Sequence, residues 1–172
     1  MHSYPYYHNQ WHSLMPNGYN GTPHYYNWAN SHPAFYYRNM ILQDYGKKPL
    51  VVNIDQAAKQ NDNYRTALWT GDHFQVTLMS INPGEDIGLE VHPHTDQFIR
   101  IEQGQGLVQM GNSKEQLDFQ TMAYEDYAIL IPAGTWHNVT NTGNVPLKVY
   151  VIYAPPQHPF GTIQPTRPAE HA

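Results

Sequence analysis

Two histidines, a glutamate and a glutamine in the second half of the chain have the side chains of a metal site. His92 and His137 supply imidazole nitrogens and Glu90 supplies a carboxylate, which together form the ligand set of non-haem Fe(II) centres and also suit Mn(II) or Zn(II). Gln97 adds an amide oxygen, either as a weak neutral fourth ligand or as an outer group that orients a water molecule. The residue types therefore predict a divalent cation bound by Glu90, His92, Gln97 and His137, with Glu90 and Gln97 as the candidate catalytic groups.

The spacing of these residues suits neighbouring strands. Successive strand residues point to opposite faces, so a strand through this segment would place Glu90, His92 and also His94 on one side. A tight turn would then bring Gln97 onto the returning strand. A rival register would use His92, His94 and His137 as ligands, and it is the less favoured alternative. An ordinary strand with a solvated polar face shows the same alternation, so alternation alone does not establish a metal site.

Two motifs contain these residues, the first from Gly84 to Gly104 and the second from Pro132 to Asn141. Together, and in this order, they resemble the two signature motifs of the cupin family. In this resemblance Glu90 stands where the first metal histidine usually lies, Gln97 stands at the usual glutamate, and Asp126 replaces the opening glycine of the second motif. The positions that agree with the family pattern are Gly84, His92, Gly104, Pro132, Gly134, His137 and Asn141.

The resemblance implies an all-β fold, namely a double-stranded β-helix or jelly-roll barrel that is usually a homodimer and holds a metal inside one end. The family includes dioxygenases, sugar-phosphate isomerases and epimerases, decarboxylases, storage proteins and ligand-sensing domains, so the fold does not select one function. We expect a metal-binding cupin that acts on a small polar substrate, as a dioxygenase or as a sugar isomerase or epimerase. A non-catalytic cupin that binds a ligand or belongs to a structural assembly such as a coat is the alternative.

The remainder of the chain predicts one barrel between two tails. Residues 1–47 are rich in tyrosine, histidine, asparagine and proline and show no helical or strand period, so we predict an extended or disordered arm. Short β-rich segments separated by turns fill residues 48–154, as is typical of an antiparallel barrel. The first of these strands is expected over residues 50–54. Residues 155–172 are rich in proline and predict an extended C-terminal tail.

Composition and charge exclude several kinds of partner. The 172 residues include no cysteine, which rules out disulfides and thiolate ligands. A formal net charge of −5 argues against a nucleic-acid partner, and no apolar run approaches the roughly twenty residues of a membrane span. The N-terminus lacks the basic and apolar regions of a signal peptide, so we expect a cytoplasmic protein. Arg65, Lys114 and Lys148 are dispersed along the sequence and indicate no phosphate-binding cluster.

Overall fold

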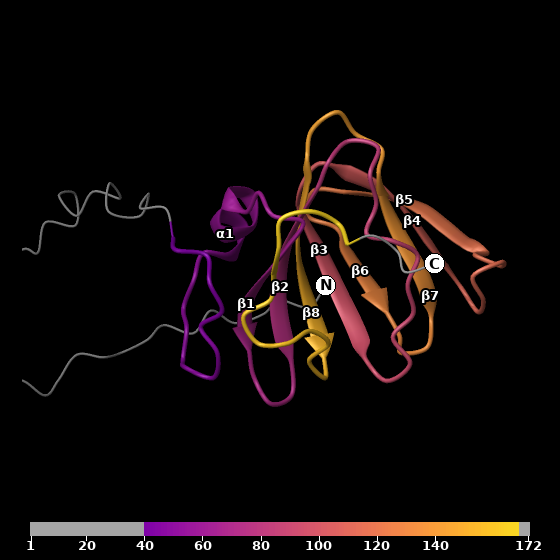
Figure 1. Ribbon diagram of the computed structural model, residues 1–172. Helices are drawn as coiled ribbons and strands as arrows, with labels where there is room; N and C mark the ends of the chain where they lie inside the picture. The colour runs from indigo at the N-terminus through magenta and orange to yellow at the C-terminus, as the bar shows by residue number, and fades with distance from the viewer. Residues whose placement is uncertain (1–39, 169–172) are drawn as a thin grey trace, which may run out of the picture. The chain divides into compact units, whose positions relative to one another are not determined.

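The computed structural model describes residues 40–168, which form two antiparallel β-sheets and one helix (Figure 1). The larger sheet has the strand order β6-β3-β8-β2-β1-β9, and the smaller has the order β5-β4-β7. The all-β, double-sheet fold predicted from the sequence is confirmed, whereas the predicted arm lies outside the described residues up to residue 39. No helix of the described region is long and apolar enough to cross a membrane. In chain order the elements are α1 (Ile54–Gln60), β1 (Arg65–Thr70), β2 (Gln75–Ile81), β3 (Asp96–Gln103), β4 (Gln105–Gly111), β5 (Phe119–Tyr124), β6 (Ala128–Ile131), β7 (Trp136–Asn141), β8 (Leu147–Ala154) and β9 (Ile163–Gln164).

Strand alternation gives the six-stranded sheet an inner face that is turned toward the smaller sheet. Directly paired residues on neighbouring strands share a face, and the register pairs Ile101 of β3 with Val149 of β8, and Val149 with Met79 of β2. These three residues belong to one buried cluster with Val108 and Val139 of the smaller sheet. The main core therefore lies between the two sheets, as in other packed β-sheet pairs.

Helix α1 packs on the outer face of the six-stranded sheet (Figure 1). Ala57 and Ala58 of the helix join Leu68 of β1 and Leu78 of β2 in a second buried cluster. Leu68 and Leu78 alternate with residues of the inner face, so the two clusters lie on opposite sides of the same strands. The helix and the smaller sheet thus shield the two faces of the larger sheet from water.

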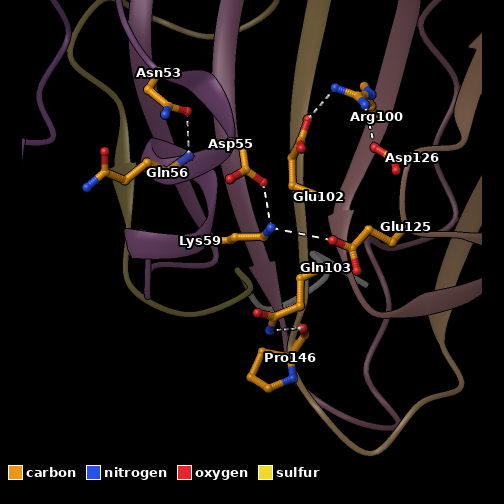
Figure 2. A network of polar contacts seen from close by, with 10 residues as sticks. All are labelled: Asn53, Asp55, Gln56, Lys59, Arg100, Glu102, Gln103, Glu125, Asp126 and Pro146. Atoms are coloured by element: carbon orange, nitrogen blue, oxygen red, sulfur yellow. Dashed lines mark hydrogen bonds and ion pairs between the residues drawn. The ribbon is translucent and has the colours of Figure 1, made fainter. Parts of the chain in front are cut away.

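Ion pairs lie on and beside helix α1 on this side of the sheet (Figure 2). Lys59 pairs with Asp55 of its own helix at 2.6 Å and with Glu125, in the loop before β6, at 3.4 Å. Arg100 of β3 pairs with the buried Glu102 at 3.1 Å. Because these charges lie on the helix side of the sheet, they are separated from the interior between the sheets.

The strand expected over residues 50–54 is absent. Helix α1 begins at Ile54, and the side chain of Asn53 caps it by accepting a hydrogen bond from the backbone N–H of Gln56 at 3.1 Å. Such a cap stabilises a helix start by about 1 kcal/mol. Val51 is fully exposed, so no burial on a sheet offsets the cap. Val52 packs against the cluster of helix α1 and the outer face, but residues 50–53 pair with no strand, so the β preference of the valines is not realised here.

Contacts with the barrel continue on both sides of the predicted boundaries at residues 48 and 154. The backbone N–H of Tyr45 donates to the carbonyl of Leu68 at 2.9 Å. After residue 154, β9 pairs with β1, with Gln164 opposite Arg65. A strand as short as β9 has no periodicity that a sequence could show, and its partner lies far away in the chain. The pairing therefore became visible only in the folded structure.

Candidate metal centre

Glu90, His92 and His137 converge inside the barrel. The Oε1 atom of Glu90 lies 3.2 Å from Nε2 of His92 and 3.4 Å from Nε2 of His137. One ligand atom from each of the three residues lies within 4.8 Å of the others. The exposed fraction of the side chain is 8% for His92 and 1% for His137, but 24% for Glu90. The two imidazoles are thus enclosed by the protein, and the Glu90 side chain is the most exposed of the three, although its Oε1 atom is buried.

A short backbone ladder holds Glu90 against His137. The N–H of Glu90 donates to the carbonyl of His137 at 3.0 Å, and the N–H of His137 donates to the carbonyl of Glu90 at 2.9 Å. The N–H of Gly134 donates to the carbonyl of His92 at 2.9 Å. The expected continuous strand through this segment is reduced to this one bridge followed by a turn at Pro93–His94. Proline has no N–H with which to continue a ladder, which explains why the pairing stops there.

The imidazole of His137 is fixed by a hydrogen bond at its other nitrogen. Nδ1 lies 2.8 Å from the carbonyl oxygen of Thr135, and because a carbonyl can only accept, Nδ1 carries the proton. In the neutral ring, Nε2 then presents a lone pair, and it faces the Glu90 carboxylate at 3.4 Å. Nε2 is thus the nitrogen that can offer its lone pair to a cation when the ring is neutral, and it is the donor to the Glu90 carboxylate when the ring is protonated.

The Glu90 carboxyl is held in its charged form. Burial raises the pKa of Glu90, but the close contacts with His137 and His92 outweigh burial and lower the pKa to about 2. Glu90 is therefore a carboxylate throughout the neutral pH range. A carboxylate beside two imidazole nitrogens attracts a divalent cation.

Comparisons with known proteins place the chain in a family. A family profile described as a cupin domain matches residues 77–153, which include both motifs. The protein YrkC of Bacillus subtilis (strain 168) is 68% identical over 130 residues, which cover 76% of this chain and 70% of YrkC. This chain belongs to the cupin family.

Two further comparisons support the assignment. The crystal structure of BH2720 from Bacillus halodurans is 66% identical in sequence, has a TM-score of 0.72, and covers 73% of this cupin and 95% of the BH2720 chain. Protein L612 of Acanthamoeba polyphaga mimivirus is 44% identical over 119 residues, which are 69% of this cupin and 72% of L612. The cupin fold predicted from the two motifs is confirmed.

The low pKa of Glu90 predicts how the stability of the metal-free cupin depends on pH. The carboxyl has a pKa of about 2 in the folded state against 4.5 as its ordinary value. Its contribution to the free energy of unfolding is therefore complete above about pH 5 and is lost as the pH falls toward 2. We expect the difference in unfolding free energy between the unmodified protein and Glu90→Gln to shrink by about 2 kcal/mol between pH 6 and pH 3. Urea denaturation in EDTA measures this difference.

The matched control for this measurement is Glu115→Gln, because Glu115 is an exposed glutamate that pairs only with its neighbour Lys114 among the described residues. The difference in unfolding free energy between Glu115→Gln and the unmodified protein is expected to stay constant between pH 6 and pH 3. If the difference in unfolding free energy between the unmodified protein and Glu90→Gln is equally independent of pH, the two imidazoles do not stabilise the charged form of Glu90.

Buried polar atoms without hydrogen-bond partners gather around this site. Gln97 is 4% exposed and pairs with Tyr153 across β3 and β8. The ring of Tyr153 contacts His92 edge-on at 5.6 Å between centroids, and it contacts His158 at 5.0 Å. Unpartnered buried groups are rare in folded proteins, so their concentration indicates an interior that binds something. These atoms include Glu90 Oε1, His92 Nε2, His137 Nε2, Gln97 Oε1, Tyr153 Oη, His158 Nε2, Thr77 Oγ1 and Arg65 Nε.

The structure separates the two ligand sets that the sequence left open. Glu90, His92 and His137 form the group of ligand atoms, whereas His94 lies exposed at the turn and outside it. Gln97 is buried on β3 with an unpartnered amide oxygen, as its strand position predicted. The role of these residues as metal ligands stays a prediction.

Three interior residues were missed by the sequence analysis. Arg65 and Tyr153 lie on strands whose alternation could have placed them on the inner face, Arg65 by its pairing with Met79 and Tyr153 by its pairing with Gln97. His158 follows β8 outside any regular element, and no sequence signal could have placed it there. Its ring reaches the interior because the segment after β8 folds back against the sheet.

Proposed function

We propose that this cupin binds a divalent cation, Fe(II), Mn(II) or Zn(II), through Glu90, His92 and His137 and acts on a small polar substrate. The observation that carries the proposal is the convergence of three ligand atoms within 4.8 Å, each without a hydrogen-bond partner. Two imidazoles and one carboxylate suit all three ions. The ion would supply Lewis-acid chemistry to a reaction of the dioxygenase or the sugar isomerase and epimerase class.

The surroundings of the three residues support this fit. The Thr135 carbonyl orients His137 by accepting from Nδ1 at 2.8 Å, which is the kind of outer contact that typically fixes a metal-binding imidazole. The ladder between Glu90 and His137 fixes the two backbones within one hydrogen-bond length. A site held in this way needs little rearrangement to bind a cation.

The two candidate catalytic groups suit different tasks. Glu90, with a pKa of about 2, is a weak proton acceptor at neutral pH and serves better as a ligand. Gln97 does not titrate, and its unpartnered buried Oε1 would bind and orient a hydroxyl group of the substrate or a water molecule. We therefore assign cation binding to Glu90 and substrate orientation to Gln97, with weak ligation by Gln97 as the other outcome.

The test is direct metal binding. The purified chain is stripped with EDTA and titrated calorimetrically with Fe(II) under argon, with Mn(II) and with Zn(II), and the metal content is measured by mass spectrometry. We expect one ion per chain and an increase in the free energy of unfolding of about 4 kcal/mol when the free ion exceeds its Kd by about 1,000-fold. Ca(II), which prefers sites made of six or more oxygens, is the control and should not bind. Bound metal below about a tenth of an ion per chain with all three cations would refute the proposal.

A further inference from the structure

Arg65 is a buried arginine on the inner face of the six-stranded sheet. Its exposed fraction is 5%. It pairs with Met79 across β1 and β2 and with Gln164 across β1 and β9. Met79 belongs to the core between the two sheets, so the arginine side chain lies on the same side of the sheet as that core. A charged side chain in this position calls for a partner.

One edge of the Arg65 guanidinium is free for a ligand. Nη1 donates to Oε1 of Gln164 at 2.8 Å. Among residues 40–168, the only hydrogen bond of Nη2 is the long contact with the sulfur of Met79 at 3.9 Å, and a thioether is a weak acceptor. The guanidinium carbon also lies 5.1 Å from the centre of the Tyr64 ring, a contact with the face of the guanidinium group that leaves its N–H edge without an acceptor. Nε has no partner. Nε–H and Nη2–H form the side-on fork with which arginine binds a carboxylate through two parallel hydrogen bonds.

No carboxylate of the described residues forms an ion pair with Arg65. The other arginines of this region are paired, Arg100 with Glu102 at 3.1 Å and Arg167 with Asp86. Burying a cation without a counterion is costly, and the link to Gln164 uses only one nitrogen. The hydrogen bond from Arg65 to Gln164 of β9 therefore leaves Nε and Nη2 of the guanidinium without an acceptor of comparable strength.

The Arg65 guanidinium shares the interior with Tyr153, which contacts the candidate metal centre. Burial alone would lower the pKa of Arg65, but Tyr153, Tyr64 and Glu90 together raise it, which places Tyr153 and Glu90 within electrostatic reach of the guanidinium. The Tyr153 ring in turn contacts His92 at 5.6 Å. Burial, followed by Arg65, lowers the pKa of His158 to about 4. His158 is therefore a neutral neighbour that does not compete with Arg65 for an anion.

We propose that the Nε–Nη2 edge of Arg65 binds the carboxylate of a small organic acid, and that another oxygen of the same acid reaches the Glu90, His92 and His137 group. The contact between the acid and the metal group rests on the proposed function. The contact between its carboxylate and Arg65 rests only on the Nε–Nη2 edge that has no carboxylate partner among the described residues. The single positive charge of Arg65 balances the single negative charge of a carboxylate. A phosphate dianion carries two negative charges and would need a second cationic side chain. Lys148, a further buried cation of the sheet, is already engaged by Asp62 at 3.0 Å.

The test compares acids with their neutral amides. Acetate with acetamide, glycolate with glycolamide, and succinate with succinamide are titrated calorimetrically into the Zn(II)-loaded and the metal-free protein. We expect at least one acid to bind about tenfold more tightly than its amide, because only the carboxylate can accept both hydrogen bonds of the fork. In Arg65→Gln this preference is expected to disappear. Equal binding of every acid and its amide by the unmodified protein, or a preference that survives in Arg65→Gln, would overturn the proposal.

Two further variants and the zinc content separate the role of the Arg65 fork from a loss of charge, of folding or of metal binding. Arg65→Lys keeps the charge without the fork and is expected to show an intermediate preference, which covers the case in which Arg65→Gln does not fold. Arg100→Gln makes the same change of charge on the outer face and should leave the preference unchanged. If the unmodified protein binds no zinc, the proposed function fails, and the titration of the metal-free protein still decides the role of Arg65. If Arg65→Gln binds as much zinc as the unmodified protein but no longer prefers an acid to its amide, both the metal site and the carboxylate site are supported.

Discussion

Replacing His137 with alanine is expected to lower the metal content of the Zn(II)-loaded protein by at least about tenfold. Loss of an outer hydrogen-bond partner of a ligand already costs about 10- to 100-fold in metal affinity, and His137 is predicted to bind the ion directly. His92→Ala and Glu90→Gln are expected to act in the same direction. Glu90→Gln keeps the shape of the side chain, so it tests the ligand with the least disturbance of packing. Zinc per chain is measured by mass spectrometry, with circular dichroism as the check on folding.

His94→Ala is the matched control, because it makes the same chemical change near His92 but at an exposed position outside the ligand group. Its zinc content is expected to equal that of the unmodified protein. If His94→Ala lost the metal while Glu90→Gln kept it, the ligand set would be His92, His94 and His137. Full zinc content in every one of these variants would mean that the ion binds elsewhere.

A chain that ends after residue 156 is expected to melt more than about 10 °C lower than the full chain, or not to fold. Gln75 is fully buried, and it donates to the His158 carbonyl at 2.9 Å and accepts from the His158 N–H at 3.0 Å. The N–H of Tyr64 donates to the carbonyl of Pro165 at 3.2 Å. Each buried group left without its partner costs about 1–3 kcal/mol, which sums to a large share of a typical stability of about 5–15 kcal/mol. Thermal unfolding followed by circular dichroism measures the change.

The control chain ends at residue 168 and keeps all of these contacts, so its melting temperature should match that of the full chain. Gln75→Ala removes the two bonds to His158, together with the bond from Gln75 to Thr70 at 2.8 Å, without shortening the chain. It is expected to lower the melting temperature by less than the truncation does. If the chain that ends after residue 156 has the same melting temperature as the full chain, the segment after residue 156 contributes nothing to stability. It would then be the extended tail that its composition predicts.

Asp126 shows how a departure from the family motif can be compatible with the fold. It occupies the position of the opening glycine in the second motif, and its φ angle is 70°. This left-handed conformation is favoured by glycine, and aspartate is among the few other residues that adopt it readily. The turn before β6 thus keeps the backbone shape that the motif requires, and the substitution adds a contact between Asp126 and Arg100 at 2.6 Å.

The sequence by itself determined the fold family, most strands and the types of side chain in the candidate metal centre. The two motifs and the strand period are local properties, because a turn residue or an alternation can be recognised within a few positions. Glu90, His92 and Gln97 lie within one motif, and His137 lies at the corresponding position of the second. Their types and order therefore predicted a site before any contact was known.

Only the tertiary structure decided which residues share the interior with that site. Alternation tells which face of a strand a side chain occupies, but its neighbours depend on the register between strands that are distant in sequence. Arg65 meets Gln164 because β9 returns to β1, and His158 reaches Tyr153 because the chain folds back after β8. The turn at Pro93–His94 leaves His94 exposed and outside the ligand group. A sequence shows which residues exist, but only the folded chain shows which of them become neighbours.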